Sequence, residues 1–88
     1  MSVNSKIKAL GEGLKDRIDA SIIDFDLEYI EHSENILAFE TLCDHIADYD
    51  AVITKDEYNL IINIANELNL IIDNRYLYIN PIRNRTFL

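Results

Sequence analysis

Two amphipathic helices are encoded most clearly in residues 35–70, which read NILAFETLCDHIADYDAVITKDEYNLIINIANELNL. In the first part of this stretch, apolar side chains recur at intervals of three and four and share one arc of a helical wheel: Phe39, Leu42, Cys43, Ile46 and Tyr49. Carboxylates occupy a separate arc at the same spacing: Glu40, Asp44 and Asp48. The pattern predicts a helix over residues 35–49 with its apolar arc against a core.

The start of the next helix is marked by Thr54 and Glu57. At this spacing the threonine hydroxyl accepts from the backbone N–H three residues on, and the glutamate reaches back to the threonine N–H. Asn69 followed by Leu70 suits a left-handed residue just after a helix end. Apolar side chains cover more than half of the circumference between these points, so we expect this helix to be the most deeply buried: Tyr58, Leu60, Ile61, Ile62, Ile64, Ala65 and Leu68.

Two further helices are predicted on the N-terminal side. A helix over residues 4–17 carries an apolar stripe at intervals of three and four: Val3, Ile7, Leu10, Leu14 and Ile18. Gly11 lies close to this stripe, where a close helix crossing would explain it. A second helix begins near Ser21 and ends between residues 32 and 34, with one apolar face and one acidic face: Ile23, Leu27 and Ile30, opposed to Asp24, Glu28 and Glu31.

The C-terminal part is less regular. The run Tyr76–Ile79 fits either a short strand or a helical turn capped by Asp73, and Pro81 forces the residue before it towards an extended backbone. We expect a short turn that packs its aromatic rings on the helices, with residues 79–88 as a loose tail. The whole chain, residues 1–88, is therefore predicted to be a single all-α domain, a small bundle of about four helices with a short irregular C-terminal segment.

Composition supports a folded, acidic domain. Of the 88 residues, 49% are hydrophobic and only two are glycine and one proline, which is unlike a disordered segment. Sixteen acidic and eight basic residues give a net charge of −8, which repels phosphate backbones and anionic lipid headgroups and favours a cationic partner. The single cysteine cannot form an internal disulfide, no secretory h-region is visible, and no apolar stretch could span a bilayer. We expect a cytoplasmic protein that binds neither nucleic acid nor membrane.

No residue pattern points to nucleophilic catalysis. Cys43 and His45 could form a nucleophile and base, but two positions apart on a helix they point in nearly opposite directions. Because Cys43 lies on the apolar arc, we interpret it as a core thiol. Glycine loops and the common nucleotide and protease motifs are absent from the sequence. The protein is therefore not expected to be an enzyme or to hold a cofactor.

Metal binding is also not predicted. Glu28 and His32 lie four residues apart and could supply two ligands, but no third ligand is signalled nearby. The spacing of Asp24, Asp26 and Glu28 imitates the start of a calcium loop, but Tyr29 stands where that loop requires glycine.

The most unusual feature is the distribution of charge. Between Arg17 and Lys55 there is no lysine or arginine, and the interval holds ten carboxylates. Like charges four residues apart cost a few tenths of a kcal/mol per pair, and we expect no compensating cation nearby. The alternative to a purely solvated face is a docking surface for a basic protein. The residues predicted to bind this partner are Asp24, Glu28, Glu31, Glu40, Asp44, Asp48, Tyr49 and Asp50. The sequence leaves open whether three tyrosines are interface anchors or core residues: Tyr29, Tyr49 and Tyr58.

Parts of residues 23–70 resemble the MafI family of immunity proteins, the small antitoxins of bacterial polymorphic-toxin and contact-dependent growth inhibition systems. The resemblance is carried by AFETLCD at residues 38–44, Tyr49-Asp50, ITKDEY at 53–58 and Leu68-Asn69-Leu70. It implies a protein that binds and neutralises a cognate secreted toxin, often a nuclease acting on RNA, by steric and electrostatic occlusion.

The sequence is also compatible with three other functions. An acidic mimic of nucleic acid would inhibit many DNA- or RNA-binding proteins. A small structural homodimer could form through the broad apolar surface of residues 54–68. A small enzyme would require a substrate site that the sequence does not reveal.

Overall fold

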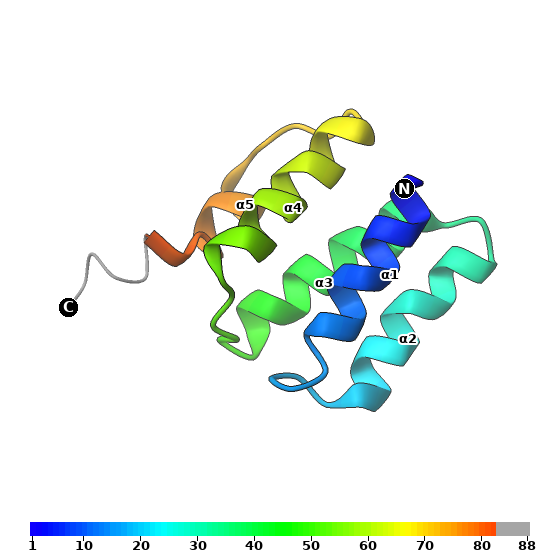
Figure 1. Ribbon diagram of the computed structural model, residues 1–88, viewed down its shortest axis with the longest axis horizontal. Coiled ribbons are helices and arrows are strands. Elements are labelled where there is room, and N and C mark those ends of the chain that lie inside the picture. The colour runs from blue at the N-terminus through cyan, green and yellow to red at the C-terminus, as the bar shows by residue number, and fades with distance from the viewer. Residues whose placement is uncertain (83–88) are drawn as a thin grey trace.

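The computed structural model describes residues 1–82, and within this range the chain is all helical, as predicted (Figure 1). The predicted tail falls partly on residues 83–88, which lie outside the described residues. No strand occurs in residues 1–82. The helices are α1 (Val3–Gly13), α2 (Ala20–Glu31), α3 (Asn35–Asp48), α4 (Lys55–Glu67) and the short α5 (Asn74–Tyr78).

Helices α1 and α3 form the centre of the bundle (Figure 1). They contact each other, and α2 packs against both of them. On the other side, α4 packs on α1 while α5 packs on α3. The first three helices therefore pack against one another, and α4 and α5 cover the rest of the core.

The most deeply buried helix is α3, so the prediction for the helix after Thr54 was wrong. Five side chains of α3 are buried, whereas α4 buries three, and the apolar residues on its flanks stay half-exposed. The reason is position in the bundle: α3 is covered by α1, α2 and α5, but α4 packs mainly on α1. A wide apolar surface on one helix does not by itself ensure that neighbouring helices cover all of it.

The first helix ends at Gly13, four residues earlier than the apolar stripe predicted. Glycine has a low helix propensity, and the Arg17 guanidinium donates to the Gly13 carbonyl at 2.6 Å, which closes the chain into a turn. Leu14 and Ile18 remain buried because the turn folds back on the core. The same guanidinium makes two hydrogen bonds to the Glu57 carboxylate, at 2.6 and 2.7 Å, and so ties this turn to the start of α4.

The close helix crossing expected at Gly11 is present. A Cβ atom at this position would lie 3.0 Å from the side chain of Leu27 on α2. That separation is shorter than ordinary van der Waals contact, so the absence of a side chain allows α1 and α2 to approach closely.

Both signals for the ends of α4 are confirmed. Thr54 and Glu57 form the reciprocal capping box. Asn69 has a positive φ of 58°, and the N–H of Leu70 donates to the Ala65 carbonyl at 2.9 Å, as in a Schellman motif.

Two other helices end in the same way without glycine. After α2 and α3 the left-handed residues are Ser33 and Asp50, with φ of 59° and 49°. In the second case the N–H of Ala51 donates to the Ile46 carbonyl at 3.0 Å. A side chain is thus retained at two positions where glycine is the usual residue.

The C-terminal segment adopts the helical alternative. Asp73 caps α5 by accepting a hydrogen bond from the Arg75 N–H, and Tyr76 is buried with its ring stacked 5.9 Å from that of Phe39. Ile79 is also buried, so the loose tail expected to begin at this residue does not include it.

Candidate protein-binding surface

A buried carboxylate joins α2 to α3. Asp26 has no exposed surface, and its Oδ2 lies 2.6 Å from Nδ1 of His45. Burial raises the pKa of the Asp26 carboxyl, and the hydrogen bond with His45 opposes this rise. This pair was not predicted from the sequence, where His45 was considered only as a possible base for Cys43. A signal was present, because Asp26 follows Ile23 by three residues and precedes Ile30 by four, which places it on the apolar face of α2.

The predicted acidic residues of α2 are paired with neighbouring side chains. Asp24 lies 2.7 Å from the Lys15 ammonium, and Glu31 lies 3.4 Å from that of Lys8. Both cations come from the N-terminal region that packs along α2. Glu28 lies 3.9 Å from Nε2 of His32 one turn later. All three carboxylates remain largely exposed, so these contacts are screened by solvent.

Two of the predicted acidic residues of α3 are bridged by Arg75. Its Nη1 donates to Glu40 at 2.7 Å and its Nε donates to Asp44 at 2.8 Å. One guanidinium from α5 therefore offsets the repulsion between carboxylates that lie four residues apart.

The expectation that the acidic residues of α2 and α3 have no compensating cation nearby was wrong. Spacing along one helix shows only charges within that helix, whereas the tertiary fold brings Lys8, Lys15 and Arg75 to α2 and α3. The carboxylates predicted as one surface are therefore divided between two groups with different internal partners.

The C-terminal end of α3 carries the remaining predicted residues. Asp48 and Asp50 are exposed, and neither forms an ion pair with another residue in the described range 1–82. Between them Tyr49 is 54% exposed, so it is not the core residue that its place on the apolar arc favours. Its ring lies 5.9 Å from that of His45, at a tilted angle. Two exposed carboxylates and an exposed aromatic ring thus follow one another along the chain where α3 ends.

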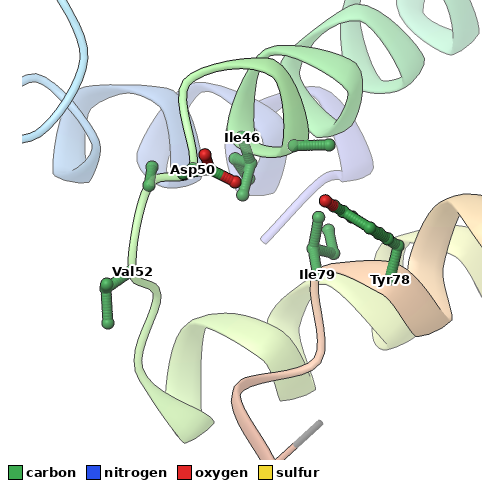
Figure 2. Close-up of a pocket in the computed structure, with 7 residues that line it drawn as sticks. Ile46, Asp50, Val52, Tyr78 and Ile79 are labelled. Carbon is green, nitrogen blue, oxygen red and sulfur yellow. The ribbon is translucent and has the colours of Figure 1, made fainter. Parts of the chain in front are cut away.

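A pocket of about 220 Å³ adjoins this helix end (Figure 2). It lies between the end of α3, the following loop and α5. Figure 2 shows the Asp50 carboxylate and the Tyr78 hydroxyl on opposite sides of it, with aliphatic side chains between and below them. The lining residues are Ile46, Ala47, Asp50, Ala51, Val52, Tyr78 and Ile79.

The other two tyrosines considered as anchors are half-buried. Tyr58 and Tyr29 pack against the core from α4 and α2. Tyr29 also meets the exposed ring of Phe25 edge-to-face, with centroids 5.5 Å apart. These two rings line a second pocket of about 190 Å³ with Glu28 and His32. Phe25 was not among the residues predicted to bind a partner.

The described residues offer neither a reactive thiol nor a metal centre. Cys43 is fully buried, and burial raises the pKa of its thiol far above the ordinary value, which suppresses the reactive thiolate. Within residues 1–82, no three His, Cys, Asp or Glu side chains are grouped so that they could hold a metal ion.

No known family model matches this chain, and neither the curated proteins nor the solved structures contain a significant match. None of the helices in the described part of the chain has both the length and the apolar character needed to cross a membrane.

Proposed function

We propose that this protein is an immunity protein that binds and neutralises a cognate toxin whose toxic domain is a basic nuclease. The resemblance of residues 23–70 to MafI-family immunity proteins supports the class. The surface at the C-terminal end of α3 supports the chemistry of the partner. In this proposal the protein has no catalytic activity of its own, and it acts in the cytoplasm.

The observation that carries the proposal is the pair of exposed carboxylates, Asp48 and Asp50, on either side of the exposed Tyr49. Among the residues that the structure describes, these acids have no ion-pair partner, whereas Asp24, Glu40 and Asp44 do. The carboxyl end of a helix also carries a partial negative charge, which adds to theirs. Tyrosine is among the residues most enriched at the energetic centres of protein interfaces.

Inhibition would follow from occupying the toxin's substrate site. A nuclease grips a polyanion with basic residues, so an anionic surface can fill the same cleft and exclude the substrate. A standard interface takes about 800 Å² from each partner, which is about 15% of the 5369 Å² surface of this protein. In this proposal the C-terminal end of α3 lies at the centre of that area.

A co-expression experiment tests the proposal. The candidate toxin is the C-terminal domain of any large secreted protein whose reading frame adjoins this gene. It is induced in cells with and without this protein, and growth is followed. We expect growth arrest without it and rescue with it, together with co-purification of the two proteins. Arrest that persists at equal expression, with no complex recovered, would contradict the proposal.

Two controls separate the alternative functions. A panel of unrelated nucleases distinguishes a dedicated inhibitor from a nucleic-acid mimic, because a mimic would inhibit several of them. Light scattering of the purified protein alone tests for a structural homodimer.

A further inference from the structure

The geometry points to the pocket beside Asp50 as the receptor for one arginine side chain of the partner protein. This inference deepens the proposed function and rests on it only for the identity of the protein that carries the arginine. The pocket volume of about 220 Å³ falls below the roughly 300–1,000 Å³ typical of small-molecule sites. It therefore suits a single side chain better than a metabolite or cofactor.

The shape of the lining matches the two parts of an arginine. The three methylene groups of the arginine side chain can pack against the aliphatic lining residues Ile46, Val52 and Ile79. The Asp50 carboxylate stands on one side of the same pocket, opposite the Tyr78 hydroxyl, and can receive the head group (Figure 2). A guanidinium can make two hydrogen bonds to one carboxylate, and it is less strongly hydrated than an ammonium, so arginine is favoured over lysine.

The charge around the pocket favours a cation over an apolar anchor. Asp50 lines the pocket and forms no ion pair with any residue in the range 1–82. The pocket also lies at the carboxyl end of α3, where the helix dipole favours positive charge. An aliphatic side chain such as leucine would fill the volume but would remove water from the Asp50 carboxylate without replacing its hydrogen bonds.

The backbone conformation at Asp50 allows a conservative substitution that removes only the charge. Its φ of 49° is the left-handed conformation in which glycine is the commonest residue and asparagine is also tolerated. Asparagine at this position therefore keeps the turn and nearly the same shape while it removes the charge. Asp50→Asn is for this reason the most informative variant.

The test uses three small probes and needs no toxin: N-acetyl-arginine amide, its neutral near-isostere N-acetyl-citrulline amide, and N-acetyl-leucine amide. Each is titrated into the ¹⁵N-labelled full chain, and backbone amide shifts are followed by NMR. We expect saturable shifts with the arginine probe at Asp50, Ala51, Val52 and Ile79. The citrulline probe should bind about tenfold more weakly, as expected for loss of a charge-assisted hydrogen bond.

The matched variants are Asp50→Asn and Glu34→Gln. Each removes one negative charge, and the two residues lie just beyond opposite ends of α3. We expect Asp50→Asn to weaken the arginine probe about tenfold and Glu34→Gln to leave it unchanged. Equal effects of both variants, shifts spread over every acidic residue, or stronger binding of the leucine probe would each overturn the inference.

The outcomes also separate this inference from the proposed function. Arginine binding at the pocket without protection from the toxin would contradict the function and leave the pocket assignment intact. Protection from the toxin without arginine binding would contradict the pocket assignment alone.

Discussion

Asp26 on α2 and His45 on α3 are joined across the helix interface by a 2.6 Å contact between Oδ2 and Nδ1. The carboxylate has no exposed surface, whereas the imidazole reaches the surface beside Tyr49. The buried acid therefore holds a histidine at the edge of the proposed partner-binding surface. It also places a titratable group inside the core, with consequences for stability.

The Asp26 carboxyl gives the protein a stability that depends on pH. Because burial raises its pKa in the folded state, the folded protein holds this proton more tightly than the unfolded chain does. The resulting stabilisation is present below the unfolded pKa and is lost as the pH rises through the folded pKa. We expect the difference in unfolding free energy, wild type minus Asp26→Asn, to increase as the pH falls from 7 towards 4. Urea unfolding followed by circular dichroism measures this difference, and a value that decreases on acidification would contradict the assignment.

Glu57 shows the opposite dependence. Hydrogen bonds from Arg17 hold the pKa of this carboxyl below its ordinary value, against the opposing effect of partial burial. Its stabilisation is present above the unfolded pKa, and it is lost as the pH falls through the folded pKa. We expect Glu57→Gln to lower the unfolding free energy by about 1–3 kcal/mol at pH 7, with a smaller loss near pH 3. The same urea titrations check this, and a deficit that grows on acidification would rule it out.

The two glycines of α1 should respond differently to alanine. At Gly13 a new Cβ would lie 3.7 Å from Glu57, an ordinary contact, so Gly13→Ala should raise the unfolding free energy by about 0.5–1 kcal/mol. At Gly11 the new Cβ would lie 3.0 Å from Leu27, and the strain should offset the propensity gain. Thermal unfolding of both variants tests the order. A Gly11→Ala protein more stable than Gly13→Ala would show that α1 and α2 do not cross closely.

The Cys43 thiol should be unreactive until the protein unfolds. It is fully buried, and burial raises its pKa far above the ordinary value. We expect Ellman's reagent to label it only in denaturant, and Cys43→Ala to lower the unfolding free energy by about 1–2 kcal/mol without affecting protection from the toxin. Rapid labelling of the native protein would show that the thiol is accessible.

Local signals in the sequence predicted much of the fold. The capping box at Thr54, the left-handed Asn69 and the Asp73 cap all depend on residues within a few positions, and the apolar arc of α3 depends on periodicity alone. The end of α1 was predicted too late because Ile18 is buried and fits the apolar spacing of the helix. It lies instead in the turn that the Arg17 side chain closes.

The candidate surface was less predictable because its electrostatics depend on tertiary contacts. Arg75 lies 31 residues from Asp44 and 35 from Glu40, so no helical spacing could reveal that it pairs with both. The burial of Asp26 likewise depends on α3 packing over it. The acidic and aromatic residues at the end of α3 were evident in the sequence. The adjoining pocket could not be predicted, because one of its sides is formed by α5.

In the proposed function, the C-terminal end of α3 meets a basic partner. The stopped-flow association rate of the full-length protein with the toxin domain identified by the co-expression experiment is measured at low and high salt. We expect Asp48→Lys to lower the rate about tenfold at low salt, with less effect at high salt, because an anionic surface steers a cationic partner. Glu34→Lys, with the same change in charge near the other end of α3, is the control and should have a smaller effect. Equal rates for wild type and Asp48→Lys at low salt, with protection from the toxin unchanged, would contradict the account.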